Sequence, residues 1–477
     1  MDGQEAMVVG RPRTRGGRRA AALACVAVVA LVAAACGSGR SSDDAAPGGG
    51  TGTTAADSSV VQFGDLESPC GPGEPSGSPD QAVDATSVTI GYGDDAGFQG
   101  NPGSNHEMSD AVRALIDWCN EQGGINGREV KGIYYDAKIT EVNNVMTEAC
   151  SQVFMLVGQG FALGASGEVT RLGCGLPSVP GLLGGSDVAN APLMVAPAPQ
   201  PVDYMNVEGA AAIAEAFPDA VKKVGVMEPN FPATIDYTQR AKGSYTSVGW
   251  EFLDCTQSYA ISGVTDFRPY LQKLKDCGAE VVLTTDTGNN LQNALDAAEQ
   301  LDFHPIWMAT SAVYTAAFSA WNVNGNADNV YIPNVFVPVE DTRPGTANAA
   351  YVDIVTAHGG DVSYTGQQAA SAFLLWATAA KACGNDLTRA CVMQQLKGVH
   401  EWTAGGLSSV QDPGGNLPGE CGMVIKVEGT AFVQWQPDAV GEFTCDPSYL
   451  VEVDPPTDTA ATLQLDGDRI AHKNETG

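Results

Sequence analysis

Few residues in this chain have the types and spacings that catalysis or metal binding requires. The five histidines, at positions 106, 304, 358, 400 and 472, are scattered, and none belongs to an HExxH pattern. His106 precedes Glu107, but we find no further group at helical spacing to complete a zinc site. A GxSxG nucleophile motif is also absent from the sequence. We therefore expect no enzyme, no metal site and no cofactor.

Two other patterns have alternative chemical interpretations. Asp94 and Asp95 could act as a carboxylate pair, but adjacent residues on a loop rarely face one substrate. The segment "GQGFALG", residues 158–164, lies one residue away from the GxGxxG pattern of nucleotide-binding loops and follows an expected strand. A protein outside the cytoplasm meets little dinucleotide, which argues against a nucleotide site. We therefore favour neither the carboxylate pair nor the nucleotide site.

The cysteines indicate an oxidising compartment. Of the 12 cysteines, Cys25 and Cys36 belong to an N-terminal targeting segment, which leaves an even number and no CxxC pair. Five disulfides are therefore expected, and we predict that they pair in sequence order. The expected pairs are Cys70 with Cys119, Cys150 with Cys174, Cys255 with Cys277, Cys383 with Cys391, and Cys421 with Cys445.

The N-terminus is predicted to direct the protein out of the cytoplasm. An arginine-rich stretch precedes "AAALACVAVVALVAAAC", residues 20–36, whose apolar run is short for a membrane span. Small residues before Cys36 resemble a bacterial lipobox, so residues 1–35 read as a signal peptide and Cys36 as a lipidated first residue. The alternative is ordinary cleavage, with Cys36 as a spare thiol. The net charge of −31 argues against nucleic acid as a partner.

Composition and hydrophobic spacing divide the rest of the chain. Residues 36–82 are rich in Gly, Ser, Pro, Asp and Thr, which predicts a flexible tether behind the lipid anchor. Beyond residue 86, β-rich runs alternate with helix-spaced apolar residues, which indicates βαβ units and parallel sheets. In "NEQGGINGRE", residues 120–129, two glycines and an Asn-Gly turn end a helix and begin a strand. The other expected helices span residues 139–152, 163–173, 206–216, 233–247, 266–276, 288–301, 346–358, 365–382 and 388–397.

Two proline-rich interruptions, near residues 196–204 and 330–345, predict that the chain crosses between two lobes. The segment "CGMVIKVEGTAFVQW" predicts a β-hairpin that closes the second lobe. The expected domains are lobe 1 at 83–200 with 338–402, lobe 2 at 201–337 with 403–450, and a loose tail at 451–477.

"WCNEQGGINGREVKGIYYDAK" resembles the leucine/isoleucine/valine-binding proteins, which have the type I periplasmic solute-binding fold. "GVTDFRPYLQKLKDCGAEVVL" and "TAGGLSSVQDPGGN" resemble later segments of that family, so the resemblance covers roughly residues 86–440. It implies two doubly wound α/β lobes joined by three crossovers, with a ligand cleft between them. The implied partners are a small-molecule ligand and the permease and ATPase subunits of an ABC importer.

In such a fold, the loops after the carboxyl ends of parallel strands face the cleft, where helix N-termini favour a carboxylate. The second lobe also contributes loops of this kind. The candidate ligand-binding residues are Phe98, Gln99, Gln159, Phe161, Ala162, Asn230, Phe231, Asp286, Thr287, Ser311 and Tyr314.

One departure from the family bears on the ligand. Amino-acid binders of this family hold the ligand with Ser and Thr side chains and an acid, and the corresponding positions here are Phe161-Ala162, Leu182-Leu183 and Ser311. We therefore expect a more apolar or planar solute than an ordinary α-amino acid, such as a carboxylate, an amide or an aromatic acid. The alternative function is a ligand-sensing surface lipoprotein that signals to a separate membrane partner.

Overall fold

The first lobe is built on a four-stranded parallel sheet. The computed structural model describes residues 61–286 and 288–455. The strand order is β4-β3-β5-β6, with β3 at Ser87–Asp94, β4 at Glu129–Asp136, β5 at Leu156–Val157 and β6 at Ser178–Val179. One face carries α1 (His106–Glu121), α10 (Ala347–Ala357), α11 (Tyr364–Cys383) and α12 (Arg389–Lys397). The other carries α2 (Val142–Gln152) and α3 (Glu168–Gly173), followed by the short α4 (Ser186–Ala189).

The second lobe contains a larger, mostly parallel sheet. Its order is β14-β13-β12-β11-β10-β8-β9, and β13 and β14 run antiparallel to their neighbours. Side chains alternate between the two faces of this sheet: Val281 and Leu283 pack under one helical layer, and Val282 packs under the other. The strands are β8 (Val224–Pro229), β9 (Phe252–Tyr259), β10 (Val281–Thr284), β11 (Ile306–Ala309), β12 (Val330–Asn334), β13 (Cys421–Glu428) and β14 (Ala431–Gln436).

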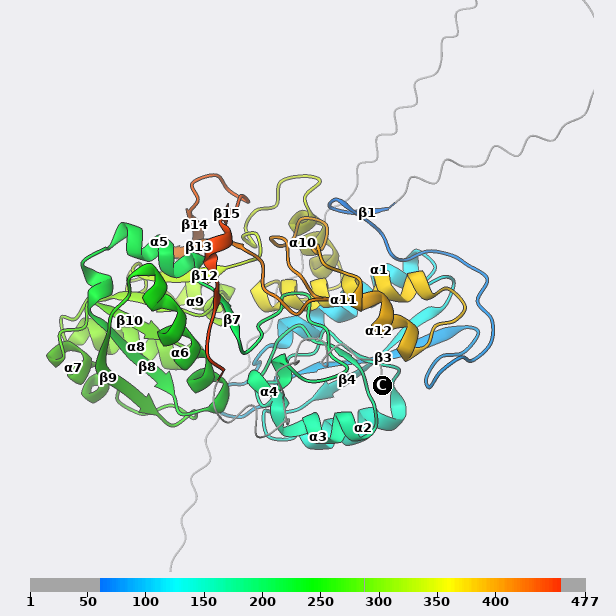
Figure 1. Ribbon diagram of the computed structural model, residues 1–477, viewed down its shortest axis with the longest axis horizontal. Coiled ribbons are helices and arrows are strands. Elements are labelled where there is room, and N and C mark those ends of the chain that lie inside the picture. The colour runs from blue at the N-terminus through cyan, green and yellow to red at the C-terminus, as the bar shows by residue number, and fades with distance from the viewer. Residues whose placement is uncertain (1–60, 287, 456–477) are drawn as a thin grey trace, which may run out of the picture. The chain divides into compact units, whose positions relative to one another are not determined.

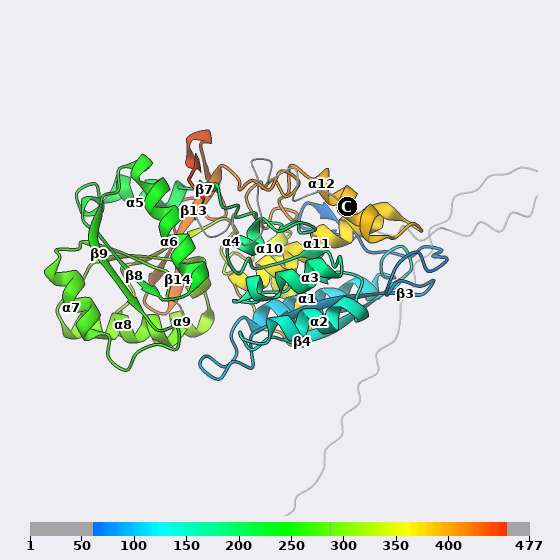
Figure 2. The same ribbon diagram turned by 60° about the horizontal axis from the view of Figure 1, so that its bottom comes forward.

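Helices cover both faces of this second sheet. Figure 2 shows α5 (Glu208–Ala216) and α6 (Pro232–Tyr245) on one side of the strands. The opposite side carries α7 (Arg268–Asp276), α8 (Gly288–Gln300) and α9 (Ala316–Trp321). The predicted fold class, two α/β lobes with doubly wound sheets, is confirmed.

The chain passes between the lobes three times, near residues 199–206, 334–337 and 417–421 (Figure 1). At the first crossing, β7 (Tyr204–Asn206) pairs with β16 (Leu450–Glu452), which returns from the end of the described chain. At the third, β15 (Thr444–Cys445) pairs with the start of β13. The crossings therefore lie beside short antiparallel pairs that join distant parts of the sequence.

The glycine joint behind α1 forms as the sequence predicts. Gly123 and Gly124 have φ of 106° and 74°, and Asn126 continues the left-handed turn at 50°. A Cβ on Gly124 would collide with the carbonyl oxygen of Arg128, so only glycine fits there. The joint directs the chain into β4, the parallel neighbour of β3.

All five disulfides pair in sequence order, as predicted. Cys70–Cys119 ties the segment before β3 to α1, and Cys383–Cys391 links α11 to α12. Cys421–Cys445 joins β13 to β15 rather than the two ends of the predicted hairpin, whose second strand is β14.

Three predicted boundaries are wrong. Residues 61–82 are folded rather than part of a tether: β1 (Gln62–Phe63) pairs with β2 (Leu66–Glu67), and Phe63 is buried. Residues 403–417 pack on lobe 1, where Ala404 and Leu407 are buried and Gly405 accepts a hydrogen bond from Asp65. The expected tail begins with β16, and Val453 is buried. In each case a few apolar side chains are buried. They are scattered through a mostly polar stretch, so the overall composition of the stretch does not reveal them.

Two helices begin three or more residues later than predicted. Lys138 and Ile139 have positive φ, so α2 begins at Val142, and a 3-10 turn at Gly164–Gly167 precedes α3. The predicted signal peptide, Cys36, the tether as far as residue 60 and the tail from residue 456 lie outside the described residues. Within the described ranges, none of the helices is long and apolar enough to cross a membrane.

Candidate ligand-binding cavity

A cavity of about 440 Å³ is lined by residues of both lobes. This volume is in the usual range for a small-molecule site. Lobe 1 contributes loops after β3, β5 and β6, together with the start of α11, and lobe 2 contributes loops after β8, β10 and β11. The cavity therefore lies at the carboxyl ends of parallel strands, where open α/β sheets bind ligands.

Five of the predicted positions line this cavity: Phe98, Ala162, Phe231, Asp286 and Ser311. Each follows a parallel strand, which is the reason the sequence argument finds them. Asp286 is buried and accepts a hydrogen bond from the Tyr259 hydroxyl, so the protein already holds its carboxylate in place.

Five other predicted residues do not line the cavity. The ring of Phe161 packs in the lobe 1 core beside α2, and Gln159 donates to Ser178 Oγ at 2.6 Å. Tyr314 is buried against Phe432, and its hydroxyl bonds Glu340. Gln99 and Asn230 are exposed. Thr287 lies outside the described residues.

The adjacent aspartates at the end of β3 have structural partners. Asp95 accepts hydrogen bonds from the amides of Ile139 and Ala162, at 2.6 and 2.7 Å, and thereby holds the cavity loop after β5. Asp94 instead accepts from the Tyr134 hydroxyl at 2.8 Å. Burial raises the pKa of Asp95 to about 6. The two carboxylates therefore hold different parts of lobe 1, a loop and strand β4, rather than one substrate.

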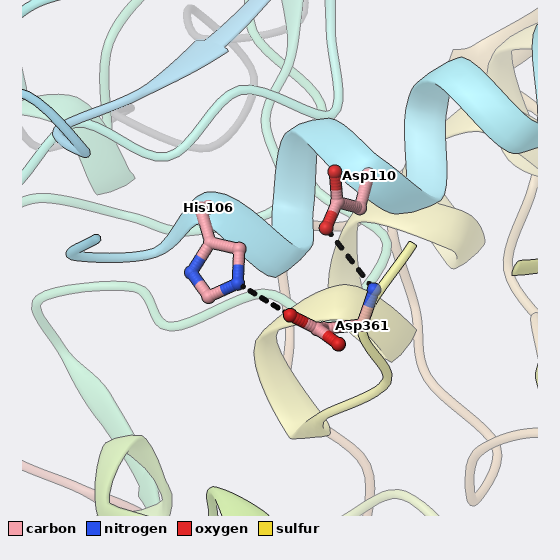
Figure 3. Close-up of side chains that lie close together, drawn as sticks. All are labelled: His106, Asp110 and Asp361. Carbon is pink, nitrogen blue, oxygen red and sulfur yellow. Dashed lines mark hydrogen bonds and ion pairs between the residues drawn. The ribbon is translucent and has the colours of Figure 1, made fainter. Parts of the chain in front are cut away.

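His106 joins a cluster of side chains (Figure 3), and the expectation that no group stands at helical spacing from it is wrong. Asp110 lies one helical turn further on, and Asp361 comes from the loop after α10, with all ligand atoms within 4.8 Å. His106 donates from Nδ1 to the Gly103 carbonyl at 2.7 Å, and its Nε2 lies 3.0 Å from Asp361 Oδ2.

Hydrogen bonds and opposite charges hold the three residues of this cluster together. Burial lowers the pKa of His106, but the hydrogen bond to Asp361 and the charge of Glu107 outweigh it and raise the pKa to about 9. The Asp361 amide also donates to Asp110 Oδ2 at 3.1 Å. We therefore interpret the cluster as an ion pair that fastens the loop before α11 to the start of α1.

Much of the cavity was not predicted from the sequence. Its walls reach past the strand ends into lobe 2, between the α5–α6 layer and the sheet. A prediction based on the loops after strands does not consider helix faces. Residues 233, 237 and 240 of α6 line the cavity along the length of that helix. The residues missed include Met205, Glu208, Ala210, Tyr237, Arg240, Tyr245, Asn290, Met308, Asn334 and Gln368.

The electrostatics of the cavity favour a polar or anionic group on a ligand. Residues at or just before the N-termini of α1, α5, α6, α8 and α11 line it, and such termini carry partial positive charge. Buried atoms of three lining residues, Thr285 Oγ1, Gln368 Oε1 and Asn334 Nδ2, have no hydrogen-bond partner among the described residues. Buried polar groups normally have one, so water or a ligand is expected to supply it.

Two α/β lobes joined by three crossings, with a polar-and-apolar cavity between them, define a hinged solute-binding protein. The comparison with known families agrees. The model of the periplasmic binding protein family matches residues 87–431, and the chain belongs to that family. Proteins of this family are extracytoplasmic, and the predicted family resemblance is confirmed.

Solved structures share the fold at low sequence identity. The fatty acid ABC transporter substrate-binding protein from Thermomonospora curvata has a TM-score of 0.64 and 12% identity, with 78% of this chain and 95% of that chain covered. LivJ from Streptococcus pneumoniae, solved with isoleucine, has a TM-score of 0.58 and 15% identity, with 76% of this chain and 100% of that chain covered. A solute-binding protein from R. palustris, solved with 4-hydroxybenzoate, has a TM-score of 0.61 and 18% identity, with 76% of this chain and 97% of that chain covered. No curated protein sequence matches the chain.

Proposed function

We propose that the protein captures a small organic solute in the cavity between its lobes and delivers it to the permease and ATPase subunits of an ABC importer. The observation that carries this proposal is the cavity itself, which both lobes line at their strand ends. Hinged lobes can close on such a ligand and bury it. The proposed role contains no catalytic step.

The walls argue for a solute other than an ordinary α-amino acid. The family resemblance matches Ala162, Leu182 and Leu183 to positions where amino-acid binders place hydroxyl side chains, and all three line the cavity. The structural relatives named above hold ligands as different as isoleucine and 4-hydroxybenzoate. This fold therefore accommodates apolar and aromatic solutes. The apolar side chains that line this cavity suit such solutes better than they suit an α-amino acid.

The proposal includes a lipid anchor at Cys36, followed by a tether that ends before β1. Replacement of Cys36 by serine removes the thiol that would receive the lipid. We expect the Cys36→Ser variant to leave the membrane fraction of the producing bacterium, whereas the native protein stays in it. Membrane retention of the variant would contradict lipidation at this residue.

Thermal unfolding of the purified protein against a solute panel tests the binding function. The panel contains amino acids, amides, short-chain carboxylates, aromatic acids and polyols. A ligand at a hundred times its dissociation constant stabilises the folded state by about 2.7 kcal/mol, which is readily visible as a melting shift. We expect a shift with an acid or an amide and none with leucine or valine. A shift with leucine would refute the argument from the walls, and no shift with any solute would favour a sensor or scaffold that binds protein.

A further inference from the structure

One buried cation, Arg240, lines the lobe 2 part of the cavity, and the nearby carboxylates of Asp236 and Asp203 favour its charge without forming an ion pair with it among the described residues. Arg240, on α6, is 8% exposed. Its Nη1 donates to the Pro201 carbonyl at 3.0 Å, while Nε is buried and has no acceptor among the described residues. No carboxylate oxygen of the described residues lies within ion-pair distance of its guanidinium. A buried charge without a contacting counter-charge is costly, so this site favours a ligand that brings one.

The neighbours of Arg240 add a further donor. Tyr237 and Tyr245 both line the cavity, and their hydroxyls lie 3.0 Å apart. Two hydroxyls carry two protons, and the bond between them uses only one. With the guanidinium Nε–H, this end of the cavity offers an anion at least two donors.

This region also has apolar walls. Met205, Ala210 and Met308 line it and also belong to the core between α5, α6 and the sheet. Seven residues separate Ala233, near the start of α6, from Arg240, which corresponds to roughly 10 Å along the helix. A ligand that reaches Arg240 from the strand ends must therefore be elongated or lie wholly within this region.

Three acids, Glu208, Asp236 and Asp286, also line the cavity, and Asp286 already accepts a hydrogen bond from the Tyr259 hydroxyl. Glu208 lines the cavity and is 2% exposed, and burial raises the pKa of its carboxyl to about 8. At neutral pH this side chain is mostly uncharged. It can donate a hydrogen bond but does not repel an anion.

We propose that Arg240 is the ligand-recognition residue for an organic carboxylate with an apolar body, which enters lobe 2 along α6. This inference rests on the proposed solute-binding function and narrows it to one class of solute. It places the charged group of the ligand on a helix side chain of lobe 2 rather than on the loops after β5 and β6.

Titration calorimetry with matched acids and amides tests this proposal on the full-length protein. The probes are octanoate with octanamide and 3-phenylpropionate with 3-phenylpropanamide, which differ only in charge within each pair. We expect at least one acid to bind the native protein about ten to a hundred times more tightly than its amide, as the loss of charge-assisted hydrogen bonds implies. An amide that binds as tightly as its acid would overturn the proposal without any variant.

Variants then assign the effect to Arg240. We expect Arg240→Met to abolish the preference for the acid, Arg240→Lys to keep part of it, and Arg268→Met, which changes an exposed arginine on α7, to leave it unchanged. The unfolding temperature without ligand verifies that each variant is folded. Equal binding of the acid by Arg240→Met would refute the role of Arg240. Binding of uncharged panel solutes alone would leave the proposed function standing and overturn the inference, while no binding at all would overturn both.

Discussion

Replacement of Arg171 by methionine is expected to lower the free energy of unfolding by about 3–5 kcal/mol, because it leaves a buried carboxylate without its partner. Arg171 and Glu168 lie one turn apart on α3, and their side chains are 1% and 4% exposed. The guanidinium donates to both Glu168 oxygens, at 2.9 and 2.6 Å. It also donates to the carbonyls of Leu176 and Pro192, at 2.7 and 2.9 Å.

This arginine also supports the binding cavity. Leu176 lies two residues before β6, and Pro192 follows α4, so the two carbonyls bracket the loop that carries Leu182 and Leu183. Loss of the guanidinium leaves three groups of acceptors unsatisfied and frees both ends of that loop. Ligand affinity is therefore expected to fall together with stability.

Urea unfolding with the disulfides intact measures the effect. The double variant Glu168→Leu/Arg171→Met removes both charges and is expected to recover part of the loss. Arg268→Met breaks an exposed pair with Asp266, 2.8 Å apart, and is expected to leave the free energy of unfolding nearly unchanged, because water screens the pair. A similarly small change for Arg171→Met would show that the buried pair does not hold lobe 1 together.

Replacement of Glu208 by glutamine is expected to stabilise the protein at alkaline pH. The folded protein raises the pKa of this carboxyl from 4.5 to about 8 by burying it at the start of α5. An acid with a raised pKa contributes stability that is complete below pH 4.5 and is lost as the pH rises to 8. Glutamine has nearly the same shape and does not ionise.

The difference between the two proteins should therefore grow from near zero at pH 4.5 to a few kcal/mol at pH 8, with about 5 kcal/mol as the upper bound. Unfolding free energies measured at intervals between pH 4 and pH 9 provide the comparison. The variant Glu74→Gln changes an exposed carboxyl and serves as the control. Parallel curves for the native protein and Glu208→Gln would mean that water entering the cavity keeps Glu208 ionised.

The fold could be predicted from the sequence because its signals are local. Gly123, Gly124 and the Asn-Gly turn end α1 wherever they occur, and helix-spaced apolar residues mark most of the helices. The pairing of the cysteines follows from the same order of elements, since successive cysteines lie on elements that are neighbours in space. Boundaries such as residue 82 were wrong because the burial of Phe63 depends on distant partners.

The site was only partly predictable for a related reason. Phe98, Ala162, Phe231, Asp286 and Ser311 follow strands, so the topology alone brings them to the cavity. Arg240 lies in the middle of α6, where its contact with the cavity depends on how α6 packs over the sheet. One signal was available: an arginine on the same helical face as Ala241, Ser244 and Tyr245, all of which are buried.

Titration calorimetry of a cavity-blocking variant tests the central claim most directly. Ala162 lines the cavity between the lobes, and Ala162→Trp would place an indole in it. Ala431→Trp places the same side chain on the exposed end of β14 and serves as the control. With the solute that gives the largest melting shift, we expect one bound molecule per native or Ala431→Trp chain and no measurable binding to Ala162→Trp. Unchanged affinity in Ala162→Trp, with the variant folded, would show that the solute binds elsewhere and contradict a binding site between the lobes.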